Sequence, residues 1–384
     1  MTSNDRGLVF PDVASPKVTV AMAVRDAPDW TRRTLEALLS HTEPCYELVV
    51  VDDASAEPDT LAMLKALQGA RVIRNRTNIG FVRSSNQAVK GAHGQYILFL
   101  NSDAVVQPGW LPPLLDRLQR PGVGAVAPML LNDDGSVQQA GAILGLDGGT
   151  QLYGIGGDPR DGRFSFSRVV DYAAAACLLV RRELIVEFGA FDETFAPAYF
   201  EDADFCLRLA AAGWRTVYEP RSRVVHGLGA SYGTDLPAFQ RNHRVFVERW
   251  RRVLQARPAS LAKANERPWL VLAARDAPAT ARILVLGTPP PSTGADITAA
   301  FVGTRVTVAT GPAYAADEVE VLALEAAALP ALVRDRRYHY EAVLVGLGSV
   351  DAELDAALTA WQPQALRFVI QDGSFVAQLR DAGF

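Results

Sequence analysis

The stretch Gln95-Tyr96-Ile97-Leu98-Phe99-Leu100-Asn101-Ser102-Asp103 decides the fold class of this chain. Apolar and aromatic residues follow Gln95 and then give way to three polar residues. This pattern is typical of a short buried strand that ends in a loop. Two similar runs come earlier: Val18–Val24, followed by Arg25-Asp26, and Glu47–Val51, followed by Asp52-Asp53.

Helical spacing alternates with these strands. Segments 30–39, 60–67 and 84–91 predict helices, and Arg71–Arg74 predicts a further strand. The order βαβαβαβ indicates a parallel sheet with helices on both faces. In such sheets ligands bind at the carboxyl ends of the strands, so the polar residues after each strand are the first candidates for a site.

The second part of this region is less regular. We expect strands at 123–131, within 169–181 and at 215–218, and helices at 201–212 and 239–254. Gly213 follows the first of these helices, where glycine commonly ends a helix. Segment 135–162 contains nine glycines, which predicts a long loop or a mobile hairpin.

The chain of 384 residues is long enough for two domains at roughly 150 residues each. We expect an extended arm over residues 1–16, an α/β domain over 17–255 and a linker rich in alanine and proline over 256–281. Four apolar runs after Arg282 predict a second, small α/β Rossmann-like domain over 282–384.

Composition excludes several classes of protein. With 38 Lys and Arg against 43 Asp and Glu, the net charge is −5, so the chain lacks the basic excess of a general nucleic-acid binder. Three cysteines, Cys45, Cys177 and Cys206, are too few for a disulfide framework, and we expect free thiols, buried at Cys177 and Cys206. No apolar run reaches about 18 residues, and the N-terminus lacks the pattern of a signal peptide. We therefore expect a cytoplasmic protein.

Four sets of polar residues are candidates for chemistry. Asp103 could hold a divalent cation that bridges phosphates, although an Asp there could equally cap the loop. One of Asp52 and Asp53 could bind a nucleobase or ribose while the other stabilises the turn. Asp202 or Glu201, at the start of a predicted helix, could be a general base, whereas Asp204 has Arg208 as a partner four residues on. His226 is a candidate metal ligand, although a lone histidine is more often structural.

Residues 17 to about 250 resemble the family 2 glycosyltransferases of the GT-A fold, most closely the bacterial rhamnosyltransferase-like branch. The segments that carry the resemblance, in the order of that family, are Val50-Val51-Asp52-Asp53-Ala54-Ser55, Asn78-Ile79-Gly80-Phe81 with Asn86, Tyr96–Asp103, Cys177–Arg182, Phe191-Asp192-Glu193, Phe200–Arg208, Gly213-Trp214-Arg215 and His226. The resemblance implies a Rossmann-like mixed sheet flanked by helices. Residues 282–384 more loosely resemble the first half of a GT-B glycosyltransferase domain.

The resemblance also implies roles for individual residues. Asp202 would be the catalytic base, and Asp103 and His226 would hold Mg²⁺ or Mn²⁺. The residues implied in binding the donor are Asp52, Asp53, Asn78, Arg83, Asn86 and Ser102. The sequence departs from the family's DxD motif at Asn101, which leaves one carboxylate for the metal, so we expect weak metal affinity.

The implied function is the transfer of a sugar, with inversion, from a nucleotide-diphosphate sugar to a surface-polysaccharide or lipid-linked glycan. The first candidate donor is dTDP-rhamnose. Such an enzyme could associate peripherally with the inner membrane or with other glycosyltransferases. Two alternatives stay open. One is a non-catalytic subunit that binds sugar nucleotides or glycans, and the other is a sugar-phosphate nucleotidyltransferase.

Overall fold

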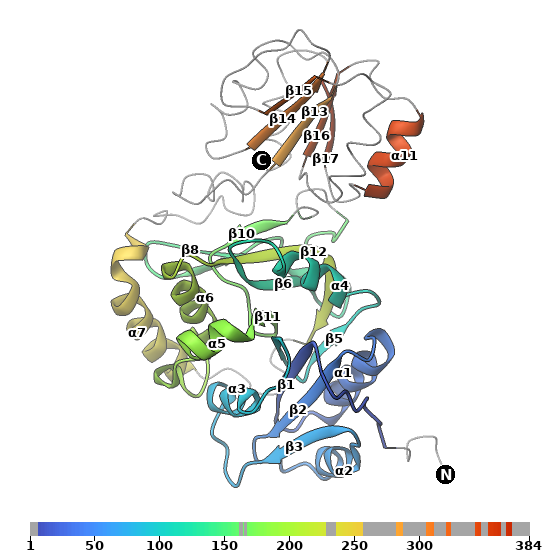
Figure 1. Cartoon of the computed structure of the whole chain (residues 1–384). Coiled ribbons are helices and arrows are strands. Elements are labelled where there is room, and N and C mark those ends of the chain that lie inside the picture. Colours follow the sequence, from blue (N-terminus) through green and yellow to red (C-terminus); the bar gives the residue numbers. More distant parts are fainter. Residues whose placement is uncertain are drawn as a thin grey trace. The chain divides into compact units, whose positions relative to one another are not determined.

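The computed structural model describes residues 7–160, 164, 167–227 and 236–255, and six short elements between residues 282 and 370. Internal contacts divide the chain into two compact units. The first comprises residues 1–157 and 170–255, and the second comprises residues 158–169 and 256–384. Each unit is described by itself (Figure 1).

Among the described residues, ten strands form one mixed sheet, and nine of them lie wholly within the first unit. Its parallel part has the order β4-β1-β2-β3, and these strands are β1 (Val18–Val24), β2 (Tyr46–Asp52), β3 (Ala70–Arg74) and β4 (Tyr96–Leu100). All seven residues of β1 are buried, because β1 lies between two neighbouring strands inside the sheet. The parallel arrangement of the first four predicted strands is therefore confirmed.

The sheet changes direction beyond β4. Strand β11 (Cys177–Arg181) is antiparallel to both β4 and β6 (Val123–Leu131), and β12 (Arg215–His226) is parallel to β6. Three short strands complete this part: β5 (Ala104–Val106) pairs with β12, β7 (Val137–Gln139) pairs with β6, and β10 (Arg168–Val170) lies at the edge. The mixed sheet expected from the family resemblance is confirmed. The alternation of the first 100 residues alone indicated only its parallel half.

Helices flank this sheet, and Figure 1 shows α1 and α3 beside the strands β1 and β2. The helices are α1 (Pro28–His41), α2 (Pro58–Ala66), α3 (Phe81–Val89), α4 (Leu111–Leu118), α5 (Arg182–Phe188), α6 (Glu201–Ala211) and α7 (Leu236–Leu254), and a 3₁₀ turn lies at Glu193–Phe195. Helices α1 and α2 begin with proline, whose fixed φ suits the first helical turn. Helix α6 ends before Gly213, whose φ of +85° confirms the predicted stop.

The glycine-rich segment 135–162 is more ordered than predicted. It contains β7 and a hairpin of β8 (Ala142–Leu144) and β9 (Thr150–Leu152). The side chains of β8 and Tyr153 are fully buried. The expectation of a long loop was wrong, and that of a hairpin was right, because apolar residues between the glycines pack into the core.

The described part of the N-terminal arm docks on the first unit. Phe10 donates its backbone N–H to Gln68 O (2.8 Å), and Gln68 N donates to Leu8 O (3.0 Å). The Phe10 ring is buried and meets Tyr46 edge-on at 6.5 Å. The predicted linker 256–281 lies outside the described residues.

In the second unit, five described strands form a parallel sheet in the order β15-β14-β13-β16-β17. Its elements are β13 (Arg282–Leu286), β14 (Arg305–Thr310), β15 (Glu320–Ala323), β16 (Ala342–Gly346), α11 (Ala352–Trp361) and β17 (Leu366–Ile370). Four of these strands coincide with the predicted apolar runs, whereas β15 and α11 were not predicted. The α/β class expected for this region is the one observed.

Cys177 and Cys206 are free and buried, as predicted, and Cys45 is free and half-buried. Burial raises the pKa of the Cys206 thiol to about 12. None of the described helices combines the length and the apolar character needed to cross a membrane.

Candidate active site

Strand pairing brings Asp103 and His226 together. Asn101, Ser102 and Asp103 follow β4, and β5 then pairs antiparallel with β12, so that Ala104 lies opposite His226. The backbone N–H of Gly227 donates to Asp103 O (2.9 Å), which extends this pairing. As a result, Asp103 Oδ1 lies 3.4 Å from His226 Nε2.

Gly227 is required by packing. A Cβ built on it would lie 2.6 Å from ring carbons of Trp30, closer than any side chain allows. Trp30 therefore fills the space beside this glycine.

The Asp103–His226 pair fits a divalent cation that is completed by other oxygens. Within the described part of the chain, no group of three or more His, Cys, Asp or Glu side chains is placed to hold a metal ion. Beside the pair, however, Asn101 Oδ1 is buried without a hydrogen-bond partner. Mg²⁺ in nucleotide-dependent enzymes uses one or two carboxylates together with substrate phosphates, and this donor set is compatible with that pattern.

Asp202 lies in the first turn of α6, where its Oδ1 accepts a hydrogen bond from Ala203 N (2.7 Å). Burial raises the pKa of Asp202 to about 6, and hydrogen bonds from the backbone of Ala203 and Ala175 oppose that rise. A carboxyl with this pKa is ionised at neutral pH and still basic enough to accept a proton.

The neighbouring carboxyls behave differently. Glu201 is buried, its Oε2 has no hydrogen-bond partner, and burial beside Asp202 raises its pKa well above the usual range. Asp204 is fully buried and pairs with Arg208 (2.9 Å) and Arg249 (2.9 Å). The structural role predicted for Asp204 through Arg208 is confirmed.

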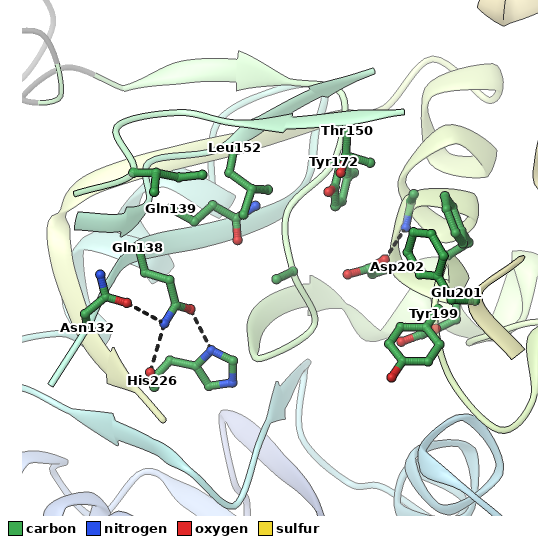
Figure 2. Close-up of a pocket in the computed structure, with 15 residues that line it drawn as sticks. Asn132, Gln138, Gln139, Thr150, Leu152, Tyr172, Tyr199, Glu201, Asp202 and His226 are labelled. Atoms are coloured by element: carbon green, nitrogen blue, oxygen red, sulfur yellow. Dashed lines mark hydrogen bonds between the residues drawn. The ribbon is translucent and has the colours of Figure 1, made fainter. Parts of the chain in front are cut away.

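Two cavities meet at Asp202. Cavity A, of about 220 Å³, is lined by Ala23, Phe81, Asn101, Ser102, Asp103, Ala174, Ala175, Ala176, Ala198, Tyr199, Glu201, Asp202 and His226. Cavity B, of about 340 Å³, is lined by Asn132, Gln138, Gln139, Thr150, Leu152, Ile155, Tyr172, Ala174, Tyr199, Phe200, Glu201, Asp202, Ala203, His226 and Phe239. Figure 2 shows His226 and Gln138 on one side of cavity B and Asp202, Glu201 and Tyr199 on the other. The structure therefore gathers Ser102, Asp103, Asp202 and His226 around one space.

Asp52 and Asp53 hold loops together and line neither cavity. Asp52 accepts from Ser55 N (2.8 Å) and forms an ion pair with Arg74. Asp53, fully buried, accepts from Asn75 Nδ2 (3.0 Å) and from the backbone of residues 79 and 80 (2.8 Å each). Their assignment to the donor nucleotide stays a prediction.

Asn78 precedes α3, and Arg83 and Asn86 lie within that helix. Asn78 Oδ1 accepts from Gly80 N (3.0 Å), Arg83 pairs with Glu193 (3.0 Å), and Asn86 bonds both the N–H and the C=O of Phe191 (3.0 and 2.7 Å). None of the three lines either cavity. The contacts of Arg83 and Asn86 support the segment that leads to α6, and the assignment of all three residues to the donor also stays a prediction.

Sequence reasoning missed two buried amides near the site. Asn242 Nδ2 donates to the carbonyls of Phe195 (2.6 Å), Ala198 (2.8 Å) and Tyr199 (3.2 Å). The sequence did contain a signal for Asn242. It lies four residues after Ala238 and four before Phe246, so a polar residue falls on the apolar, buried face of α7. The other amide is Gln138, which contacts His226 (2.7 Å) and had no signal in the sequence.

The fold and the site define a class of protein. The chain is similar to the crystal structure of GalNAc-T7 with UDP, GalNAc and Mn²⁺, with a TM-score of 0.50 and 18% identity over 66% of this chain and 54% of that one. At this identity the similarity concerns the fold, which is the GT-A fold of glycosyltransferases. Residues 19–186 match the family model described as Glycosyl transferase family 2. Residues 19–186 therefore resemble a family 2 glycosyltransferase domain, which supports the expected family and the expected class of enzyme.

Two relatives are similar over most of this domain. The O-antigen biosynthesis protein RfbC of Myxococcus xanthus is 34% identical over 235 residues, which cover 59% of this chain and 18% of the relative. The N-acetylglucosaminyl-diphospho-decaprenol L-rhamnosyltransferase of Mycobacterium tuberculosis is 29% identical over 232 residues, which cover 53% of this chain and 73% of the relative. The match thus spans less than a fifth of the Myxococcus protein.

Proposed function

We propose that this chain transfers a sugar, with inversion, from a nucleotide-diphosphate sugar to a hydroxyl of a surface-polysaccharide or lipid-linked glycan. The observation that carries this proposal is the meeting of Asp103, His226 and Asp202 at cavity A. dTDP-rhamnose is the first candidate donor, a choice supported by the rhamnosyltransferase and O-antigen names of the two relatives.

In this proposal Asp202 is the base. Its carboxylate takes the proton of the acceptor hydroxyl while the acceptor oxygen forms a bond to the anomeric carbon and the bond to the diphosphate breaks. The proton ends on Asp202, and the electron pair of the broken bond leaves with the diphosphate. Because Asp202 borders both cavities, the donor sugar in cavity A and an acceptor in cavity B would both reach it.

Asp103 and His226 would hold the divalent cation, with Asn101 Oδ1 beside them. Such a cation neutralises negative charge on a leaving diphosphate. Ser102, which lines cavity A and is buried, would contact the donor there. With one carboxylate in the set, we expect the cation to bind weakly unless the nucleotide is also bound.

The apolar and aromatic lining of cavity B supports its assignment to the acceptor. Tyr199, Phe200 and Phe239 form a cluster whose ring centroids lie 5.1 to 5.6 Å apart. The rings offer apolar faces and Tyr199 adds a polar hydroxyl, a combination that suits a sugar ring or the first part of a lipid-linked glycan.

The test is donor hydrolysis by the whole chain across a panel of dTDP-, UDP- and GDP-sugars, with Mn²⁺, with Mg²⁺ and with EDTA. We expect release of one nucleotide diphosphate that EDTA abolishes. Asp103→Ala should lose the metal-dependent part of donor binding, whereas Asp133→Ala, a change at an exposed loop residue, should not. Absence of binding to every donor under every metal condition would overturn the proposal. Release that EDTA leaves unchanged would overturn the role of the metal.

A further inference from the structure

We propose that Gln138 is a positioning residue that fixes His226 in the tautomer with the proton on Nδ1. The lone pair of His226 Nε2 is thereby directed at Asp103. This inference deepens the proposed function, on which the role of His226 as a metal ligand rests.

The orientation of the Gln138 amide follows from its partners. Gln138 Nε2 lies 2.9 Å from the backbone carbonyl of His226 and 3.2 Å from Asn132 Oδ1. A carbonyl oxygen can only accept, so the Gln138 atom that faces it must be the NH₂ group. Asn132 is itself anchored, because its Nδ2 donates to Ser136 Oγ (2.9 Å) and leaves Oδ1 for Gln138.

The position of the imidazole proton follows in turn. With its NH₂ group engaged, Gln138 presents Oε1 to His226 Nδ1 at 2.7 Å, as Figure 2 shows. Since an amide oxygen only accepts, Nδ1 must carry the hydrogen. A neutral imidazole has one N–H, so Nε2 keeps its lone pair.

The Nε2 lone pair faces a site suited to a cation. Asp103 Oδ1 lies 3.4 Å from Nε2, and Asn101 Nδ2 donates a hydrogen bond to the same nitrogen (3.3 Å), which a bound cation would replace. Two lone-pair groups this close attract a positive ion between them. If the proton moved to Nε2, His226 would instead donate to Asp103, and the two candidate ligands would neutralise each other. Gln138 disfavours that arrangement.

The burial of Gln138 makes the constraint strong. Gln138 is 6% exposed, in the short strand β7, so water cannot replace its partners freely. Moving the proton away from Nδ1 would leave Gln138 Oε1 facing a lone pair in a buried site, which costs the desolvation free energy of an unpaired acceptor.

The first experiment reads the tautomer directly. We would record ¹⁵N NMR of the histidine rings in the whole chain without metal, and assign His226 by comparison with His226→Asn. Wild type should show the Nδ1–H form. Gln138→Met should shift His226 toward the Nε2–H form. Gln139→Met is the matched control, because Gln139 is the next residue of β7, is also buried, and has an Nε2 without a partner.

The second experiment measures binding of Mn²⁺ in the presence of dTDP, from the EPR signal of free Mn²⁺. Gln138→Met should raise the Kd by about 10- to 100-fold, the usual cost of losing such a support of a metal-bound histidine. Gln139→Met should stay close to wild type. Thermal melts of all variants would separate a loss of folding from a loss of binding.

The outcomes are distinguishable. An Nε2–H tautomer in wild type, or a Gln138→Met protein with an unchanged tautomer, would overturn this inference whatever the metal does. If wild type does not bind Mn²⁺ in the presence of dTDP, the metal-binding part of the proposed function is wrong. The tautomer measured by NMR still decides the role of Gln138.

Discussion

Asp202 and Glu201 show how position sets the chemistry of two adjacent carboxyls. Both are affected mainly by burial, which penalises the charged form. Asp202 also receives backbone hydrogen bonds that favour its charge, so its pKa rises only to about 6. Glu201 has an unpaired buried oxygen and lies beside Asp202, and its burial raises its pKa well above the usual range.

The pKa of Asp202 predicts the pH dependence of activity. A base must be deprotonated, so kcat/KM should fall about tenfold per pH unit below pH 6 and level off above it. Initial rates of transfer between pH 4.5 and 8.5, once an acceptor is found, measure this. A profile that is flat through pH 6 would contradict Asp202 as the base.

Replacing Asp202 should separate activity from stability. Asp202→Asn should lower kcat by about 10²- to 10⁴-fold, the contribution of a positioned base. The folded pKa of about 6 lies above the unfolded value of about 3.9, so this carboxyl reduces stability as the pH rises from 4 to 6. Asp202→Asn should therefore melt at an equal or higher temperature at pH 8.

Asp204→Asn is the control for that comparison. It lies two residues away in α6 but holds Arg208 and Arg249 at 2.9 Å each. Losing a fully buried partner of two cations should lower the melting temperature. The opposite pattern, with Asp202→Asn destabilised and Asp204→Asn unchanged, would contradict our assignment of roles in α6.

At the scale of elements, segment 191–200 is held between two helices. From α3, Asn86 bonds Phe191, Arg83 pairs with Glu193, and Val82 N donates to Pro197 O (3.0 Å). From α7, Asn242 bonds three carbonyls of the same segment. The segment ends in Tyr199 and Phe200 with φ of +79° and +68°, a strained backbone that these contacts maintain and that sets the direction of α6.

This arrangement predicts the effect of removing the amide of α7. Asn242→Ala leaves three carbonyls without their donor, so we expect a loss of about 1 to 3 kcal/mol in stability. Because the strained turn would then relax and displace Asp202, kcat should fall as well. Chemical denaturation and transfer rates measure the two effects. Arg244→Ala, an exposed position of the same helix, should change neither.

A buried ion-pair network joins α4 to β12. Glu219 is fully buried and pairs with Arg117 (3.0 Å) and Arg221 (2.7 Å). These cations lower the pKa of Glu219 to about 2 despite its burial. The stabilisation from Glu219 is therefore complete above its unfolded pKa of about 4.3 and is lost as the pH falls from there toward 2.

Breaking this network should be costly. Glu219→Gln leaves two guanidinium groups facing a neutral amide, and we expect a loss of about 3 to 5 kcal/mol in urea unfolding at pH 7. Asp133→Asn removes the exposed pair with Arg33 and should cost less than about 1 kcal/mol. An equal cost for both changes would contradict the role of burial.

At the scale of the whole molecule, every predicted site residue belongs to the first unit, which has its own sheet and core. A chain that ends at Gln255 should therefore keep the metal-dependent release of nucleotide diphosphate and the cooperative unfolding of that unit. The hydrolysis panel above, run on both lengths, measures this. A folded but inactive shorter chain would show that the second unit contributes to the site.

Most strands of the molecule could be predicted from local patterns. β1 and β6 are observed at the predicted residues, because a continuous apolar run bounded by turn residues has few other ways to be buried. β12 was predicted only to Tyr218, although it continues to His226. Its second part includes Glu219, Arg221 and Arg223, whose charges hide a strand that pairs with β5 and β6.

The sequence by itself determined the fold class, the family and the set of residue types that the reaction needs, because buried runs and short motifs are local properties. The tertiary structure alone decided which of them meet. It placed Asp103 beside His226 through the β5–β12 pairing, and it gave Asp52, Asp53 and Asn86 partners within the protein. It also brought Gln138 and Asn242 to the site. Such contacts join residues tens of positions apart, and their geometry depends on strand register and helix packing, which no local pattern encodes.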